Sequence, residues 1–160
     1  PEKAVMLTFD DGYKNNFYWA FPLLEKYDLQ GNFGIITDFI GKNDFYMNDH
    51  EIEEISKNHQ LCSHTQTHPD LTTLSLSSLQ GELKSSKEYL ESQFDTRVNC
   101  LIYPSGQYND RVIEQTKKHY TFARTTQAGK NVDFQKRYAL PTVRIFPETG
   151  LTAVKIWFSQ

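Results

Sequence analysis

Residues 7–13 read LTFDDGY, an apolar run typical of a buried strand that ends in two adjacent carboxylates and a glycine. Successive side chains on a strand point to opposite faces, so Asp10 and Asp11 cannot share one environment. Gly12 permits the sharp turn that lifts both carboxylates into a loop above the strand. An Asp-Gly pair is also common in solvated turns, so this stretch alone leaves both interpretations open.

Outward from this stretch, strand-like and helix-like runs alternate along the chain. The strand-like runs are 4–9, 31–37, 60–63, 97–104, 121–125 and 138–146. The helix-like runs are 18–29, 48–59, 75–94, 109–120 and 149–159, of which 75–94 has the clearest apolar stripe (Leu76, Leu79, Leu83, Leu90 and Phe94). This alternation predicts one α/β domain over residues 1–160 with a mainly parallel sheet, and leaves open whether the sheet is a barrel.

The composition excludes two classes of partner. With a net charge of −3 the chain has no basic footprint for nucleic-acid phosphates. It also has no apolar run near the roughly 18 residues of a membrane span. The first residues lack the pattern of a signal peptide. Because the chain begins at Pro1, we expect it to be an excerpt of a longer protein.

The two cysteines, Cys62 and Cys100, are too few for a disulfide framework and lack the spacing of a metal site. We expect two buried thiols. A disulfide between them remains an alternative if their two strand-like runs are neighbours.

A second polar stretch, SHTQTHP, follows the third strand-like run. Chemistry in parallel α/β folds gathers where strands end. His64 and His68 are four residues apart, which on a helical turn directs both imidazoles to one side, a spacing that zinc sites use. Thr65 occupies the place where thermolysin-type motifs carry a catalytic Glu, so a base must come from elsewhere. Alone, this spacing can also arise by chance.

The two stretches together predict a catalytic metal site. Two neutral imidazoles and one carboxylate form a three-ligand set with open coordination positions. One aspartate of the doublet would bind the ion, and the other would stay free as a base. A bound metal lowers the pKa of its water from 15.7 to about 7, within reach of such a base. Zinc suits these ligands best, although cobalt, nickel or iron would fit them.

The stretch IYPSGQYND follows the fourth strand-like run. Pro104 and Gly106 fix a tight loop that could aim a backbone N–H at the reacting centre, an interaction worth about 10²–10³ in rate. The other interpretation is an ordinary turn before a helix capped by Asn109 or Asp110.

In this order and spacing, TFDDG, SHTQTH and YPSGQYN resemble the polysaccharide deacetylases of carbohydrate esterase family 4, and YALPTVRI extends the similarity toward the end of the chain. The resemblance implies a distorted, TIM-like (β/α) barrel with fewer than eight repeats, here truncated at its N-terminus. It also implies hydrolysis of an acetyl group on a sugar polymer. The YPSG form is most similar to the poly-N-acetylglucosamine deacetylase branch.

The resemblance also implies roles for individual residues. Asp10 is expected to be the catalytic base, with Asp11, His64 and His68 as metal ligands. The backbone N–H of Ser105 is expected to stabilise the oxyanion. The residues expected to line the sugar groove are Tyr103, Pro104 and Tyr108.

Three positions depart from the family pattern. Ile102 stands where many members carry the arginine that orients the base, and we expect Arg144, or as a second choice Arg124, to replace it. Ser105 stands where the family usually has an aromatic residue. No histidine follows His119, although the family usually has a late one as general acid. We expect that histidine upstream of Pro1; the alternative is a slow or altered enzyme.

The resulting prediction is a metal-dependent hydrolase that removes acetyl groups from an N-acetylglucosamine-containing polysaccharide: poly-N-acetylglucosamine, peptidoglycan or a chitin-like chain. It is expected to be monomeric and extracellular or at the cell surface. The alternatives are an acetylxylan O-deacetylase, a non-catalytic carbohydrate-binding relative and a hydrolase of another amide such as a cyclic imide. The aromatic content of 14% favours a sugar ligand.

Overall fold

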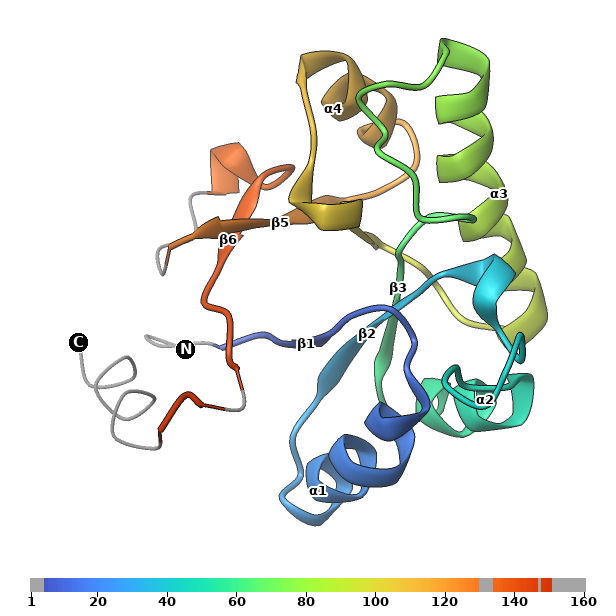
Figure 1. Cartoon of the computed structure of the whole chain (residues 1–160), viewed down its shortest axis with the longest axis vertical. Helices are drawn as coiled ribbons and strands as arrows, with labels where there is room; N and C mark the ends of the chain where they lie inside the picture. Colours follow the sequence, from blue (N-terminus) through green and yellow to red (C-terminus); the bar gives the residue numbers. More distant parts are fainter. Residues whose placement is uncertain (1–4, 130–133, 147, 151–160) are drawn as a thin grey trace.

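The computed structural model describes residues 5–129, 134–146 and 148–150 (Figure 1). Its centre is a six-stranded sheet in which every neighbouring pair is parallel and the strand order follows the chain. The strands are β1 (Leu7–Phe9), β2 (Gly31–Ile35), β3 (Gln60–Ser63), β4 (Cys100–Ile102), β5 (Phe122–Ala128) and β6 (Leu140–Thr142). The sheet curls into a partial barrel whose edges are β1 and β6, which confirms the expected incomplete (β/α) barrel.

The helices lie around the outside of the curled sheet (Figure 1). They are a π-helical turn η1 (Asn16–Ala20), then α1 (Phe21–Lys26), α2 (Asp49–Ser56), α3 (Leu76–Phe94) and α4 (Asp110–Thr116). Short 3₁₀ turns add η2 (Thr37–Phe39), η3 (Pro104–Gly106) and η4 (Phe134–Lys136). The predicted helices over 18–29, 48–59, 75–94 and 109–120 are thus confirmed, with shorter bounds. The one expected over 149–159 lies almost entirely outside the described residues.

Side-chain caps fix where the longer helices begin. Asn48 accepts a hydrogen bond from the Glu51 amide while the Glu51 carboxylate accepts from the Asn48 amide, a capping box that starts α2. At the starts of α3 and α4 only the cap side chain takes part: Ser75 accepts from the Ser78 amide, and Asn109 accepts from the Val112 amide. Of the two candidate caps for α4, Asn109 is therefore the one used. At its other end α3 stops at Asp95, whose backbone is left-handed.

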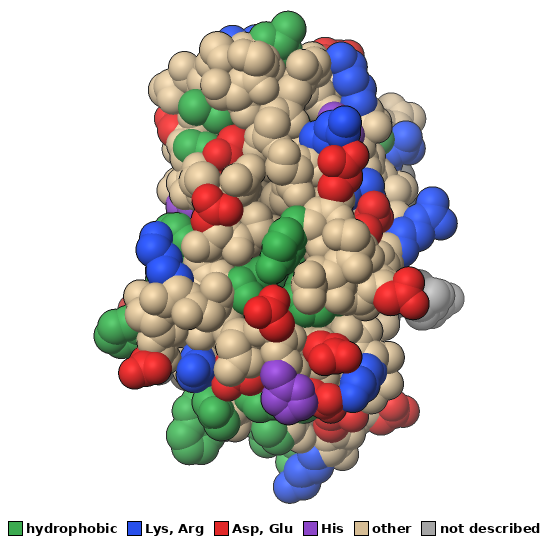
Figure 2. All heavy atoms as spheres, turned by 90° about the vertical axis from the view of Figure 1, so that its right-hand side faces the viewer, with side chains coloured by type: hydrophobic (Ala, Val, Ile, Leu, Met, Phe, Trp, Pro, Cys, Tyr) green, Lys and Arg blue, Asp and Glu red, His purple; other side chains and the backbone are tan. Residues whose placement is uncertain are grey.

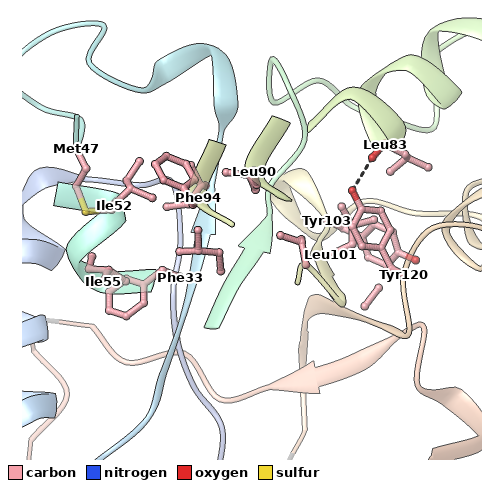
Figure 3. Packing of buried hydrophobic residues seen from close by; sticks show 14 of the residues in the cluster. Phe33, Met47, Ile52, Ile55, Leu83, Leu90, Phe94, Leu101, Tyr103 and Tyr120 are labelled. Atoms are coloured by element: carbon pink, nitrogen blue, oxygen red, sulfur yellow. Dashed lines mark hydrogen bonds between the residues drawn. The ribbon is translucent and has the colours of Figure 1, made fainter. Parts of the chain in front are cut away.

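The main core fills the space between the sheet and the helices (Figure 3). On α3 the buried stripe is Leu79, Leu83, Leu90 and Phe94. Leu76, which we expected in that stripe, is 50% exposed because it lies at the first position of the helix. Across from α3, Leu61 and Leu101 are fully buried on the outer face of the sheet. The Tyr120 hydroxyl donates to the Leu83 carbonyl (2.6 Å), which satisfies its polar end within this core.

The side chains that alternate with Leu61 and Leu101 form a second cluster, made of Cys62, Cys100 and Ile102. Cys62 and Cys100 form a disulfide between neighbouring strands β3 and β4, so the expectation of two free thiols is wrong. Their Cα atoms are 4.9 Å apart, within the range that a disulfide spans. The neighbouring-strand alternative was therefore the correct one.

One face of the molecule, seen from the right-hand side of Figure 1, carries positive and negative side chains interspersed (Figure 2). On this face there is no continuous basic surface of the kind that binds nucleic acid. Among the described helices, none combines the length and apolar composition that crossing a bilayer requires.

Candidate metal-binding and catalytic site

The acidic doublet lies in the loop that follows β1, as predicted. Asp11 (φ 69°) and Gly12 (φ 70°) both have left-handed backbones, which turn the chain sharply just beyond the strand. The Gly12 carbonyl accepts a hydrogen bond from the Met47 amide (3.0 Å), which holds the turn in place. Asp10 and Asp11 consequently face different neighbours: a guanidinium in one case and two imidazoles in the other.

His64 follows β3 directly and is 3% exposed. Its Nδ1 lies 2.7 Å from the Ile102 carbonyl oxygen on β4. A carbonyl only accepts, so Nδ1 carries the proton in the neutral ring, and the lone pair of Nε2 is left facing Asp11. Such an outer contact is how proteins fix the tautomer and orientation of a metal-binding histidine.

His68 reaches the same place through an irregular loop. We expected His64 and His68 to share one helical turn, and this is wrong: no helix covers residues 64–70. Thr65 (φ 69°) and His68 (φ 62°) have left-handed backbones, and the His68 amide donates to the Thr65 hydroxyl (3.0 Å). The loop brings the two rings to 4.6 Å between centroids. Strained backbone of this kind concentrates at functional sites.

Asp11, His64 and His68 form a set of three side chains whose nearest ligand atoms all lie within 4.8 Å of one another. Asp11 Oδ1 is 3.3 Å from His64 Nε2 and 3.7 Å from His68 Nε2. Around a tetrahedral zinc ion with bonds of about 2.0–2.2 Å, neighbouring ligand atoms are about 3.3–3.6 Å apart. The spacing and the donor types therefore fit a divalent cation.

Electrostatics keep this set in the protonation state that binds a metal. The contact with His64 lowers the pKa of Asp11 despite its partial burial. Burial, followed by the charge of His64, lowers the pKa of His68. Both shifts favour an ionised carboxylate and a neutral imidazole, so protons compete less with a cation for these atoms.

Asp10 pairs with Arg124, a residue of β5 that is 5% exposed. Arg124 Nη2 contacts both carboxylate oxygens of Asp10. Arg144, our first choice for this role, instead stacks its guanidinium on the Phe146 ring, 5.0 Å from the centroid. The sheet register explains why Arg124 can replace an arginine at position 102. Arg124 is the β5 partner of Ile102, which stands where many family members carry their arginine.

Ser105 lies in the turn η3, which follows β4. Ser105 (φ 52°) and Gly106 (φ 72°) are left-handed, and the turn is closed by the Gly106 and Gln107 amides (2.8 and 3.0 Å). A β-carbon on Gly106 would lie 2.1 Å from the Thr126 hydroxyl oxygen, so only glycine fits. Ser105 itself is exposed. Its role as an oxyanion donor stays a prediction.

Tyr103 does not line a groove. It is 1% exposed, its hydroxyl donates to the Tyr138 carbonyl (3.0 Å), and burial raises its pKa to about 12. Pro104 is also buried, and Tyr108 is half-buried with its ring stacked on Tyr103 (5.3 Å between centroids). Tyr103, before the η3 turn, and Pro104, its first residue, are therefore packed in the interior and not exposed to a ligand.

Glu82 is a residue of this site that the sequence did not reveal. Its carboxylate accepts from the Gln66 amide (2.8 Å), the Thr67 amide (2.9 Å) and the Thr67 hydroxyl (2.6 Å). One side chain of α3 thus holds the loop between His64 and His68. A sequence carries no local signal for this contact, because the partners are 15 and 16 residues apart.

Comparisons with known proteins agree with this geometry. A family model described as polysaccharide deacetylase matches residues 1–122. YxkH of Bacillus subtilis (strain 168) is 32% identical over 148 residues, covering 91% of this chain and 53% of that protein. The poly-β-1,6-N-acetyl-D-glucosamine N-deacetylase of Staphylococcus epidermidis is 25% identical over 173 residues (98% and 60%). The chain thus spans between half and two thirds of the length of these relatives.

The fold has also been seen in solved structures. The Streptococcus pyogenes deacetylase PplD, solved in complex with acetate, superposes with a TM-score of 0.91 and 28% identity, covering 98% of this chain and 70% of that one. A polysaccharide deacetylase from Bacillus cereus gives a TM-score of 0.85 and 32% identity, with coverage of 95% and 50%.

Proposed function

Because the chain belongs to the polysaccharide deacetylase family, we propose that it hydrolyses acetyl groups on an N-acetylglucosamine-containing polysaccharide. The observation that carries the proposal is the division of the acidic doublet. Asp11 turns toward two imidazoles, while Asp10 turns toward a buried arginine. Two adjacent carboxylates with such different partners suit two different jobs.

Asp11, His64 and His68 would hold the metal. A cation in that place supplies Lewis acidity to a water molecule and to the acetyl carbonyl. Zinc is the ion that two imidazoles and a carboxylate suit best, and cobalt, nickel or iron fit the same donors. His64 and His68 act as neutral ligands, and the Ile102 carbonyl keeps His64 in the tautomer that this requires.

Asp10 acts as the general base, taking a proton from the attacking water. Arg124 holds both oxygens of its carboxylate, which fixes the direction in which the base accepts that proton. The Ser105 amide stabilises the negative charge that develops on the acetyl oxygen. The products are acetate and a free amine. The proton that Asp10 takes from water balances the proton that the leaving amine gains as the C–N bond breaks.

An N-acetylated polymer is the substrate that we favour. Two lines support it: the YPSG form of the third motif and the similarity to a poly-β-1,6-N-acetyl-D-glucosamine N-deacetylase. An O-acetylated polymer such as acetylxylan is the alternative. A surface or extracellular location is supported by the disulfide, since disulfides persist in oxidising compartments.

The test is acetate release from an acetylated chito-oligosaccharide and from an O-acetylated xylo-oligosaccharide. We expect release from the first substrate, loss of release with a chelator and recovery with added zinc. Asp10→Asn should lower the rate by about 10²–10⁴ while zinc still binds. The matched control is Asp38→Asn, an exposed carboxylate that follows β2. Full activity of Asp10→Asn would refute the assigned role.

A further inference from the structure

Beside the acidic doublet lies a hollow of about 520 Å³. Its walls are the segment that follows Gly12 and the segment that precedes Met47. We call it the aromatic hollow, because four aromatic side chains line it: Tyr13, Tyr18, Trp19 and Phe45. Trp19 is 74% exposed and Phe45 75% exposed. A folded domain rarely presents so much aromatic surface in one place without a ligand or partner for it.

The hollow also carries polar groups of both signs. Lys14, Asn15 and Asp44 complete its lining and supply an ammonium, an amide and a carboxylate. Pockets that combine apolar faces with a few hydrogen-bonding groups bind small, amphipathic ligands. Since the one cation and the one anion balance, the lining suits a neutral ligand with many hydroxyls better than a highly charged one.

The walls of the hollow are held together before any ligand arrives. The Lys14 amide donates to the Phe45 carbonyl (2.7 Å), and the Tyr13 and Tyr46 rings stack with their centroids 5.4 Å apart. The Met47 amide bonds to the Gly12 carbonyl (3.0 Å) just beyond. A preformed site loses little entropy when a ligand binds.

The hollow lies beside the proposed reaction centre, because Tyr13 stacks on Tyr46, and Tyr46 and Asp11 together line a small neighbouring pocket. A polysaccharide with one acetyl group at that centre can therefore place a neighbouring ring against this loop. We propose that the aromatic hollow binds a sugar ring of the same acetylated polysaccharide, next to the ring that reacts. The apolar faces of the ring would stack on Trp19 and Phe45, and its hydroxyls would meet Asn15 and Asp44. This inference rests on the proposed function.

The experiment measures binding of an acetylated chito-hexasaccharide and the matching disaccharide by calorimetry, in an Asp10→Asn background in which turnover is slowed. Trp19→Ala and Phe45→Ala, one on each wall, should each weaken hexasaccharide binding about tenfold and the disaccharide less. Tyr27→Ala is the matched control, an aromatic residue directly after α1 that is 61% exposed and does not line the hollow. It should leave both affinities unchanged.

Unchanged hexasaccharide affinity in both hollow variants would overturn the inference. The inference would also be overturned if the two variants bound anionic lipid vesicles more weakly than the parent protein but kept its hexasaccharide affinity, because the hollow would then be a membrane contact. The proposed function is judged separately by acetate release from the unmodified chain. If acetate is released but the variants bind normally, only the hollow is refuted. If no acetate is released but Trp19 and Phe45 still govern binding, the hollow stands and the hydrolase does not.

Discussion

Replacing Glu82 by alanine should weaken metal binding without touching a metal ligand. Glu82 accepts three hydrogen bonds from Gln66 and Thr67, in the loop that joins the two histidines. Each such bond contributes about 0.5–1.5 kcal/mol net. Water replaces part of the loss because Thr67 is exposed. The loop would therefore lose about 1.5–3 kcal/mol of the free energy that holds it in its metal-binding conformation. At 1.4 kcal/mol per factor of ten, this corresponds to about 10–100-fold in zinc affinity.

The assay is competition for zinc against a chromogenic chelator, read beside the absorption spectrum of the cobalt-loaded protein. Glu82→Ala should raise the zinc Kd by that factor and shift the cobalt bands, while Glu82→Gln, which keeps one acceptor oxygen, should lie between. Glu88→Ala is the control: it removes an exposed carboxylate of the same helix that pairs only with Lys84 among the described residues. Wild-type zinc affinity in Glu82→Ala would refute the reasoning.

Further predictions concern the base, a buried histidine and a glycine. Arg124→Met should lower the rate of acetate release at least about tenfold at saturating zinc. Arg124→Lys should recover part of that rate, because a single nitrogen of Arg124 contacts both Asp10 oxygens. Equal rates in the two variants and the unmodified protein would contradict this. Burial lowers the pKa of His59, so the folded protein favours its neutral form. The free energy of unfolding should therefore fall as the pH drops below about 6.5. Urea titrations should show a smaller fall in His59→Gln. Gly106→Ala should cost about 1–3 kcal/mol because its β-carbon has no room, whereas Gly81→Ala, a helical glycine with open space around it, should be neutral or stabilising by thermal melting.

The sequence predicted the parts of the site that depend on chain order. Parallel strands with helical connections bring their carboxyl ends to one edge, so Asp11 and His64 had to meet there once the alternation was recognised. The sequence did not predict the backbone that carries His68, because a four-residue spacing from His64 is compatible both with a helical turn and with the left-handed loop that forms. Only the loop's hydrogen bonds distinguish the two.

Other features needed the register of the sheet. Arg124 lies within β5 and Arg144 just after β6, and only the pairing of Arg124 with Ile102 shows which of the two reaches Asp10. Tyr103 looked like a ligand contact because it stands beside a loop motif. It lies just after β4, however, and its ring is buried in the same core as Leu101. The side on which a strand residue points is a property of the assembled sheet.

The disulfide joins the strand that leads into His64 to the strand whose Ile102 carbonyl orients that ring. A preparation made in a reducing cytosol would begin with two thiols at this junction, and the two strands would be free to shift against each other. Metal content per molecule should then vary between batches in step with the number of thiols that react with Ellman's reagent. Purification under oxidising conditions should bring every batch to the same stoichiometry.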